Sequence, residues 1–333
     1  NRNMAVMFIT HDFGVVADIA DQVVVLRHGK VVEEGTAANV FANPQADYTK
    51  ALLAAVPSFD PPPRAPLTGA PKAVEVIGLD KTYVTATGWF RPDRETRAAN
   101  EVNFTILKGE TLGLVGESGS GKSSVARLVM RLIEADRGTV RIGDVDLTAL
   151  EGTALREQRH RIQMIFQDPF ASLNPRRKVG RIIADGMVAR GTSLDAALKR
   201  ARELLGLVGL DAGAIERYPH EFSGGQRQRI GIARALALEP EIIVADEAVS
   251  ALDVSVQAQV LKLLEDLKAR LGLSMLFITH DLRVAAQICD RIAVMQKGAI
   301  VEMKPTASLF ANPEHVYTRE LLAAVPGRKH AAA

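Results

Sequence analysis

The sequence predicts an α/β protein with a largely parallel β-sheet. Two observations lead to this fold class. Five short apolar runs, each of strand length, alternate with longer stretches of helical patterning, as expected for buried strands joined by helices. A glycine-rich loop also lies directly between one of these runs and a helical stretch, which is the context that a phosphate-binding loop requires.

The individual elements follow from the same patterns. The apolar runs that predict strands are 111–115, 162–166, 242–245, 274–278 and 292–295. Helical patterning is clear in 123–133 and 256–271. The segment 168–222 is rich in helical patterning and lacks apolar runs of strand length, so we expect a helical insertion there.

The composition is that of an ordinary globular protein. Of the 333 residues, 47% are hydrophobic and 24% are charged, and the net charge is +2. This near-neutral balance favours neither nucleic acid nor an acidic lipid surface as the main partner. The one cysteine, Cys289, excludes a disulfide framework and a cysteine-based metal site. The apolar runs 4–9 and 275–278 are too short to cross a bilayer.

Two parts of the chain repeat each other. Residues 8–12 recur as residues 277–281, which lie 269 positions later. The register then holds without gaps for about fifty residues, and about half of the aligned positions are identical. The second copy closes a long segment that starts near Ala73. We therefore expect residues 1–57 to be the C-terminal tail of a first domain of the same kind.

The tail and the linker have their own expected properties. The tail would hold one strand, beginning with the apolar run 4–9, a helix and a short hairpin. It is too small to bury a core alone, so we expect it to be loosely ordered or to pack on the intact domain. Residues 58–72 contain five prolines, which predicts a stiff, extended linker. A complete domain is expected over 73–304, with a helical subdomain at about 168–230 and a C-terminal extension over 305–333.

The glycine-rich loop predicts a nucleotide site. Its glycines allow backbone N–H groups to converge on phosphate oxygens at a helix N-terminus, Lys122 can reach the β- and γ-phosphates, and the Ser123 hydroxyl can ligate Mg²⁺. A glycine- and serine-rich turn without function is the alternative, but the flanking strand and the Lys-Ser pair argue against it. The predicted nucleotide-binding residues are Gly116, Glu117, Ser118, Gly119, Ser120, Gly121, Lys122, Ser123 and Ser124.

An acidic pair follows the apolar run 242–245. Two carboxylates at the end of a buried strand are costly unless they serve a cation or a proton. We expect Asp246 to hold Mg²⁺ and Glu247 to act as the general base that polarises the attacking water. An acidic loop after a strand is the alternative interpretation.

Three further residues are candidates by position. Gln167 ends the run 162–166, where a neutral amide can reach Mg²⁺ and the attacking water, although alone this signal is weak. His280 follows a strand at the carboxyl edge of the sheet and can hydrogen-bond a γ-phosphate, although a lone histidine is usually structural. Tyr83 can stack on adenine, and a tyrosine used only for packing is the competing interpretation.

These residues, in this order, resemble the nucleotide-binding domain of the ATP-binding cassette (ABC) family over nearly all of 74–326. The resemblance implies a P-loop NTPase fold with a RecA-like core, an antiparallel β subdomain and a helical subdomain, and it implies ATP and Mg²⁺ as cofactors. Gln167, Glu247 and His280 would be catalytic, and Mg²⁺ would be held through Ser123, Gln167 and Asp246. The family's D-loop matches 250–253 and includes Asp253, and its signature matches Ser223, Gly224, Gly225 and Gln226.

Finer features resemble the ATPases of di- and oligopeptide importers. The segments 166–169, 172–175 and 312–319 carry this likeness, while 217–222 and 246–250 resemble the tandem-cassette importers of glutathione. Some positions depart from the pattern: Phe222 stands where leucine is usual, Ala248-Val249 replaces Pro-Thr, and Val316 replaces a proline. None of these departures touches a residue with an expected catalytic role.

The resemblance also implies partners. Two cassettes would meet head to tail, so that the signature serves the ATP held by the other cassette, either fused in the same parent chain or in a homodimer. Two membrane permease subunits and a periplasmic or lipoprotein peptide-binding protein would complete an importer at the cytoplasmic face of the bacterial inner membrane. The segment after Gln167 would transmit motion to the permease.

Two alternatives and the cargo stay open. The chain could be a non-transport ABC ATPase acting on ribosomes or DNA, although it lacks the coiled coils, cysteine clusters and basic arms typical of such proteins. It could also be a catalytically incomplete fragment that serves as an interaction module. Glutathione, dipeptides, longer peptides and peptide antibiotics remain possible cargoes, because the permease and the binding protein select them.

Overall fold

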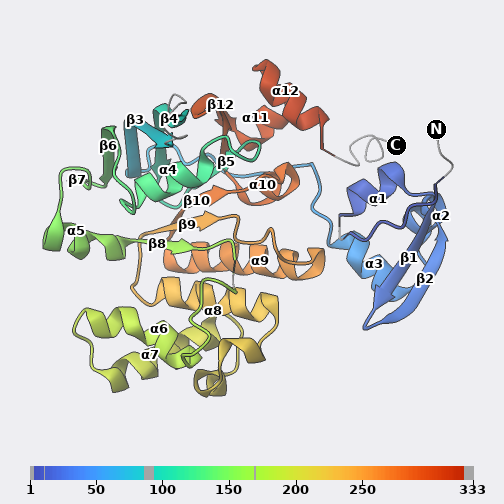
Figure 1. The fold of residues 1–333 in the computed structure, drawn as a ribbon, viewed down its shortest axis with the longest axis horizontal. Coiled ribbons are helices and arrows are strands. Elements are labelled where there is room, and N and C mark those ends of the chain that lie inside the picture. Colours follow the sequence, from blue (N-terminus) through green and yellow to red (C-terminus); the bar gives the residue numbers. More distant parts are fainter. Residues whose placement is uncertain (1–3, 11, 86–93, 169, 326–333) are drawn as a thin grey trace.

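The computed structural model describes residues 4–10, 12–85, 94–168 and 170–325 of the chain. Figure 1 shows a large layered body and, beside it, a smaller body formed by the N-terminal residues. No helix within these described ranges is both long enough and apolar enough to cross a membrane.

A six-stranded sheet forms the centre of the large body. Five of its strands are the predicted apolar runs, and they lie parallel to their neighbours, while the edge strand β12 is antiparallel to β11. The predicted α/β fold with a mostly parallel sheet is therefore confirmed. In spatial order the strands are β12 (Ala299–Pro305), β11 (Arg291–Gln296), β5 (Thr111–Val115), β10 (Ser274–Ile278), β9 (Ile242–Asp246) and β8 (Ile162–Ile165).

A four-stranded antiparallel sheet covers one side of this centre. Helix α4 (Lys122–Val129) lies between the two sheets, and its buried residues share one apolar core with both. This arrangement corresponds to the expected antiparallel β subdomain. The order of its strands is β4 (Arg94–Leu107), β3 (Lys72–Thr85), β6 (Arg137–Ile142) and β7 (Val145–Asp146).

Helices cover the other side of the central sheet. Strand β10 shows how the sheet divides the core, because Met275 and Phe277 pack into the helical side while Leu276 and Ile278 pack toward α4. The expected helical insertion is present as two long helices and two short 3₁₀ turns. The elements on this side are α6 (Val179–Ala189), α7 (Leu194–Leu207), α8 (Gly224–Leu236), α9 (Val254–Leu271), α10 (Leu282–Ile288), α11 (Thr306–Ala311) and α12 (Val316–Ala323).

The N-terminal body reproduces the end of the large body. It contains α1 (Phe13–Ile19), β1 (Gln22–Arg27), β2 (Lys30–Thr36), α2 (Ala37–Ala42) and α3 (Asp47–Ala54). Even a register irregularity recurs, between Val25 and Leu26 in the first hairpin and between Val294 and Met295 in the second. The same sequence pattern therefore gives the same hairpin in both copies.

The strand expected at 4–9 is wrong for this structure. Residues 4–10 form no strand, and Met7 and Ile9 are each 87% exposed. Their counterpart in the second copy is β10, which is hydrogen-bonded to β5 on one side and to β9 on the other. Within the described residues the first copy has no such neighbours, and an apolar run without pairing partners does not form a strand.

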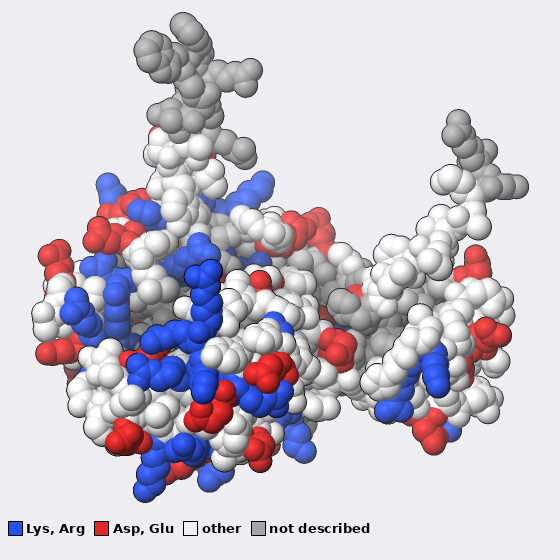
Figure 2. All heavy atoms as spheres, turned by 60° about the horizontal axis from the view of Figure 1, so that its bottom comes forward, with Lys and Arg blue, Asp and Glu red and all other residues white. Residues whose placement is uncertain are grey.

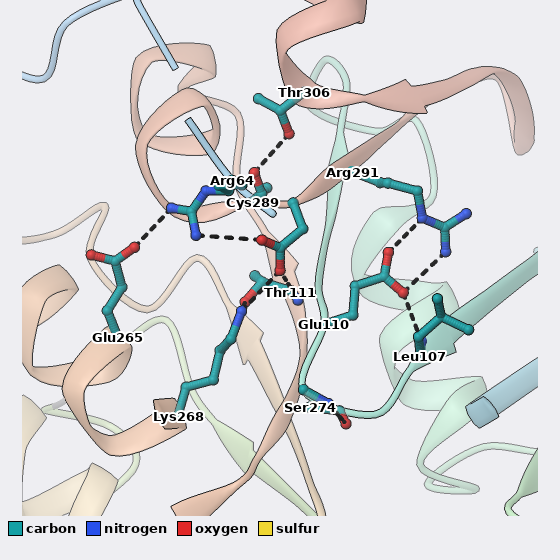
Figure 3. Close-up of polar contacts among 12 residues, drawn as sticks. Arg64, Leu107, Glu110, Thr111, Glu265, Lys268, Ser274, Cys289, Arg291 and Thr306 are labelled. Carbon is teal, nitrogen blue, oxygen red and sulfur yellow. Dashed lines mark hydrogen bonds and ion pairs between the residues drawn. The ribbon is translucent and has the colours of Figure 1, made fainter. Parts of the chain in front are cut away.

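The linker runs along the large body without regular secondary structure, and Arg64 anchors it. The guanidinium group of Arg64 donates to Glu265 at 2.8 Å, to Asp290 at 3.4 Å and to the backbone carbonyl of Gln287. Figure 3 shows this group beside Glu265 and Cys289, at the end of the sheet where β5 begins. Cys289 is fully buried there, and burial raises the pKa of its thiol.

Candidate active site

The phosphate loop joins β5 to α4, and its backbone requires glycine at two positions. Gly116 has φ +149° and Gly121 has φ +108°. A Cβ atom on Gly116 would lie 2.2 Å from the carbonyl oxygen of Met295, and one on Gly121 would lie 2.1 Å from that of Ala98. Because backbone atoms occupy both places, a side chain at either position would displace the loop from β11 or β4.

Two side chains inside the loop are buried. The ammonium group of Lys122 donates to the carbonyls of Gly116 at 2.7 Å and Glu117 at 2.9 Å. Burial lowers the pKa of Lys122, while the charges of Glu247 and Asp246 oppose this shift. The hydroxyl of Ser120 is buried and has no hydrogen-bond partner among the described residues. A buried polar atom without a partner indicates a place for a ligand group.

Asp246 lies at the end of β9 and meets the first turn of α4. The Ser123 hydroxyl donates to a carboxylate oxygen of Asp246 at 3.1 Å. Burial raises the pKa of Asp246, the hydrogen bond from Ser123 lowers it, and the charge of Glu247 raises it. A hydroxyl and a carboxylate side by side are the hard oxygen donors that Mg²⁺ prefers when phosphates and waters complete its shell. The donor set therefore fits the expected metal.

Glu247 contacts the two other predicted catalytic side chains. One of its carboxylate oxygens accepts a hydrogen bond from the Gln167 amide at 2.8 Å, and the other lies 3.2 Å from Nδ1 of His280. The His280 hydrogen bond is the main cause that lowers the pKa of Glu247, and the same bond raises the pKa of His280. Glu247 also has φ +47°, in the left-handed region that a minority of non-glycine residues adopt.

The structure thus brings together most of the predicted site. Gln167, Asp246, Glu247 and His280 come from the carboxyl ends of β8, β9 and β10, next to the loop after β5. Of the remaining loop residues, three are exposed and one is half-buried, so all of them border the loop surface: Glu117, Ser118, Gly119 and Ser124.

Tyr83, Asp253 and the signature lie apart from this group. Tyr83 is on β3, 37% exposed, with the Lys81 ammonium 6.0 Å from its ring centre. Asp253 caps α9 by accepting from the Val256 amide at 3.0 Å. Within the described residues, no hydrogen bond or ion pair joins any of them to the phosphate loop.

The signature begins α8. Ser223 is the N-cap residue, and its side chain and that of Gln226 exchange hydrogen bonds with each other's backbone amide at 3.4 and 3.1 Å. Ser223 and Gln226 are exposed, Gly224 is half-buried and Gly225 is buried. Figure 1 places α8 and α4 on opposite sides of the central sheet. The signature therefore belongs to the helical side of the sheet, apart from helix α4 and the phosphate loop that precedes it.

The structure adds a contact that the motifs did not predict. The hydroxyl of Tyr317, on α12, accepts a hydrogen bond from the backbone amide of Glu117 in the phosphate loop at 3.1 Å. Tyr317 is 6% exposed and comes from the predicted C-terminal extension. Two sequence signals include Tyr317, its match to Tyr48 in the repeat and its place in the importer-like segment 312–319, but neither predicts a contact with the phosphate loop.

A second set of contacts joins α8 to the segment that follows β8. The guanidinium of Arg227 lies 4.0 Å from the ring centre of Phe170, and that of Arg234 lies 5.5 Å from that of Phe166. Arg234 also donates to the carbonyl of Ser172. The residues around Gln167 are therefore in contact with the signature helix.

A groove of about 500 Å³ opens next to these contacts. Its lining combines apolar side chains with charged ones, among them Phe166, Arg177, Asp185, Arg234 and Leu238. Figure 2 shows Lys and Arg side chains gathered on this helical part of the large body, with acidic side chains among them.

Comparison with known proteins identifies the class of protein. Residues 99–250 match the family described as ABC transporter, and residues 32–81 and 301–332 match the family described as oligopeptide/dipeptide transporter, C-terminal region. The chain therefore belongs to the ABC transporter ATPases, with an ATP-binding cassette and a peptide-transporter C-terminal region. The expected family is confirmed, and ATP binding is a property of that family.

The particular relatives are import proteins. The chain is 47% identical over 350 residues to the glutathione import ATP-binding protein GsiA of Salmonella paratyphi A, covering 97% of this chain and 56% of that protein. It is 47% identical over 352 residues, with the same coverage, to GsiA of Escherichia coli strain K12. The chain thus spans about half the length of these curated relatives.

A solved structure shares the cassette fold. The ATP-binding cassette MJ0796, in a dimeric post-hydrolysis state bound to ADP and Pi, has a TM-score of 0.62 and 29% sequence identity. The match covers 70% of this chain and 98% of that one.

Proposed function

We propose that this chain binds and hydrolyses ATP as part of an ABC importer for peptides, with glutathione, a dipeptide or an oligopeptide as cargo. The observation that carries the proposal is the cluster in which Glu247 joins Gln167 and His280, beside the Ser123–Asp246 pair. The names of the relatives support the import role and favour glutathione. The complex would lie at the cytoplasmic face of the bacterial inner membrane.

Nucleotide binding would require one rearrangement of the phosphate loop, at Lys122. Lys122 donates to the carbonyls of its own loop, and exchange of these acceptors for phosphate oxygens would direct its charge toward the nucleotide. The Ser120 hydroxyl would gain the partner that it lacks. Tyr83 would stack on adenine from the antiparallel sheet. Ser123, Asp246 and the carbonyl oxygen of Gln167 would hold Mg²⁺, which neutralises phosphate charge when bound.

Hydrolysis would depend on the protonation state of Glu247. Its lowered pKa keeps it a carboxylate at neutral pH, so it can accept a proton from an attacking water. His280 would release Glu247 to hydrogen-bond the γ-phosphate, and Gln167 would orient the water with its amide. Gln167 and His280, which hydrogen-bond Glu247 in this structure, would thus each take a new partner in the reaction: the attacking water for Gln167 and the γ-phosphate for His280.

The site would be completed by a second cassette. The exposed residues Ser223 and Gln226, with the glycines between them, would face the γ-phosphate of the other cassette, where the N-terminus of α8 favours negative charge. In the parent protein, that cassette would be the one to which residues 1–57 belong. Asp253 would help to join the two cassettes at their interface.

The permease would dock at the groove beside Phe166. The groove is lined by Phe166, which directly precedes Gln167, and by Arg234 of the signature helix, whose guanidinium lies over the Phe166 ring. A helix of a membrane subunit seated there would move with both motifs. Two permease subunits would receive the cargo from a periplasmic or lipoprotein binding protein.

Replacement of Glu247 tests the catalytic part of the proposal. Glu247→Gln keeps the size and shape of the side chain, but the amide of glutamine cannot accept the proton from water. We expect ATP binding to be retained and turnover to fall by at least about 100-fold, the size of a general-base contribution. Binding is measured with a fluorescent ATP analogue and turnover by phosphate release.

Glu239→Gln is the matched control. Its side chain is 79% exposed and lies outside the cluster, so both measurements should stay at wild-type values. Normal turnover in Glu247→Gln would remove Glu247 from the proposed role. Co-purification with a permease, and the ligand of the associated binding protein, would test the import role and name the cargo.

A further inference from the structure

Helix α10 directly follows His280, and the N-terminal part of the chain contacts both of its ends. At the first turn, the guanidinium of Arg283 donates to both carboxylate oxygens of Asp12 at 3.3 Å. The same guanidinium bonds Asp281 at 3.3 and 3.4 Å. The side chain of Arg283 is only 11% exposed, and that of Asp12 is 30% exposed. A partly buried cation therefore joins two carboxylates that come from opposite ends of the sequence.

The two aspartates are equivalent positions of the repeat. Asp12 and Asp281 lie 269 residues apart, and each is the N-cap of the helix that follows it, α1 and α10. Arg283 has no equivalent in the first copy, where Gly14 occupies its place. Arg283 thus pairs with the equivalent aspartates of both copies. Because the first copy has no matching arginine, the contact between the two copies is not symmetric.

The last turn of α10 is attached to the linker. The side-chain amide of Gln287 donates to the carbonyls of Ser58 at 2.8 Å and Asp60 at 3.1 Å. In return, the backbone carbonyl of Gln287 accepts from Arg64, which also pairs with Glu265 and Asp290. The two attachments lie four residues apart, one helical turn, so both hold the same face of α10.

We propose that the N-terminal segment, through Asp12 and the linker, braces α10 and thereby positions His280 against Glu247. Arg283 is the positioning residue, because it joins Asp12 to Asp281, which is the N-cap of α10 and directly follows His280. The Asp281 amide, which donates to the Thr279 hydroxyl at 3.0 Å, closes the loop that carries His280. The proposal rests on the proposed function of His280 in hydrolysis, and it assigns the first copy of the repeat a direct effect on that residue.

Asp12→Asn isolates the charge of the brace. Asparagine remains a good N-cap for α1, where Asp12 accepts from the Gly14 amide at 2.9 Å, so α1 is retained. Removal of the charge weakens the bond to Arg283, and we expect backbone amides of 279–288 to exchange about tenfold faster. Gln287→Ala should have the same effect from the other end of the helix. Hydrogen exchange followed by mass spectrometry on the whole chain measures both.

Turnover separates positioning from general stability. In the proposed reaction His280 hydrogen-bonds the γ-phosphate. Because Asp12→Asn should displace His280, kcat for ATP should fall about fivefold to tenfold while KM stays unchanged. Asp12→Glu restores the charge and should recover most of kcat. Asp47→Asn is the control, because Asp47 lies in the same N-terminal body and its ion pair with Lys50 is exposed.

The outcomes separate the two proposals. Unchanged exchange at 279–288 in both Asp12→Asn and Gln287→Ala overturns the brace, and faster exchange with an unchanged kcat overturns the positioning of His280. An equal loss in Asp47→Asn also overturns it, since the effect would then come from general loosening of the N-terminal body. A wild-type chain without turnover even at protein concentrations where chains associate would contradict the proposed function alone, because the exchange experiment still tests the brace.

Discussion

At the scale of single residues, Glu247 is the centre of the site. Its neighbours Gln167 and His280 could be selected from the sequence because each ends an apolar run, and parallel strands deliver their carboxyl ends to one edge. Tyr317 could not be selected in this way. Its contact with Glu117 spans 200 residues, and only the packing of α12 beside the phosphate loop brings the two together.

Tyr317→Phe should weaken nucleotide binding without abolishing hydrolysis. The change removes the acceptor of the Glu117 amide and keeps the ring in its buried place. Loss of one hydrogen bond of about 1 kcal/mol predicts a rise of about fivefold in KM for ATP with a small change in kcat. The measurement is steady-state ATPase activity, together with the affinity for a fluorescent nucleotide.

The repeat supplies a matched control for this variant. Tyr48 is the counterpart of Tyr317, and its ring lies under the guanidinium of Arg27 at 4.8 Å in the N-terminal body. Tyr48→Phe should therefore leave KM unchanged. Equal effects of both substitutions would show that the hydroxyl of Tyr317 has no specific influence on the phosphate loop.

At the scale of elements, one strand-to-helix clamp occurs twice. Glu302 of β12 accepts from the backbone amides of Glu314 at 2.8 Å and His315 at 3.0 Å, just before α12. Glu33 of β2 holds the amides of Gln45 and Ala46 in the same way before α3, at 2.7 and 3.0 Å. The repeat in the sequence predicted equivalent segments, and both copies hold the residues just before the next helix with a glutamate carboxylate, which is buried in Glu302 and half-buried in Glu33.

Glu302→Gln should destabilise the protein in a pH-dependent manner. Burial alone would raise the pKa of Glu302, but hydrogen bonds from the Glu314 and His315 amides and the ion pair with Lys304 at 3.4 Å outweigh it and lower the pKa to about 2. A lowered pKa contributes stability above the unfolded value of about 4.3, and this stability is lost as the pH falls from there toward 2. We expect a loss of about 2 kcal/mol at pH 7 that shrinks below pH 4.

Chemical denaturation at a series of pH values measures this effect. The control is Glu314→Gln, because Glu314 is 71% exposed and bonds only Lys304 through its side chain in the described structure. That variant should lose little stability at any pH. A loss in Glu302→Gln that stays constant from pH 7 to pH 3 would contradict the carboxylate role.

Residues 4–9 mark the limit of prediction at this scale. Their apolar pattern equals that of β10, yet only β10 is a strand, because β5 and β9 bond it on both sides. The periodicity of a segment shows which of its faces can be buried. Whether the segment forms a strand also depends on adjacent strands that can hydrogen-bond it, and its own sequence does not show whether these are present.

At the scale of the whole molecule, the proposed half-site lies apart from the signature of its own domain, because α4 and α8 pack on opposite sides of the central sheet. The sequence order of the motifs predicted the cassette, and the repeat predicted a second, related unit. Neither pattern predicted that the N-terminal body would meet the large body at α10, since that contact depends on single side chains such as Arg283 and Gln287.

The separation of half-site and signature predicts that hydrolysis depends on protein concentration. A lone chain supplies no signature to its own nucleotide, so two chains must meet before a full site forms. We expect low ATPase activity per molecule in dilute solution and an increase as chains associate. Phosphate release over a dilution series, with the oligomeric state from analytical ultracentrifugation, measures both quantities. High activity that stays constant on dilution would contradict the shared site.

The rate at which Cys289 reacts with an alkylating reagent would report how often the protein opens around it. Its thiol is the only one in the chain, it is fully buried at the end of α10, and it lies beside the anchor of the linker. An alkylating reagent reaches it only when that corner of the protein opens, so the rate of modification counts opening events directly. The exposed surface, in turn, is free of thiols, and a cysteine introduced there would be the only fast-reacting label on the molecule.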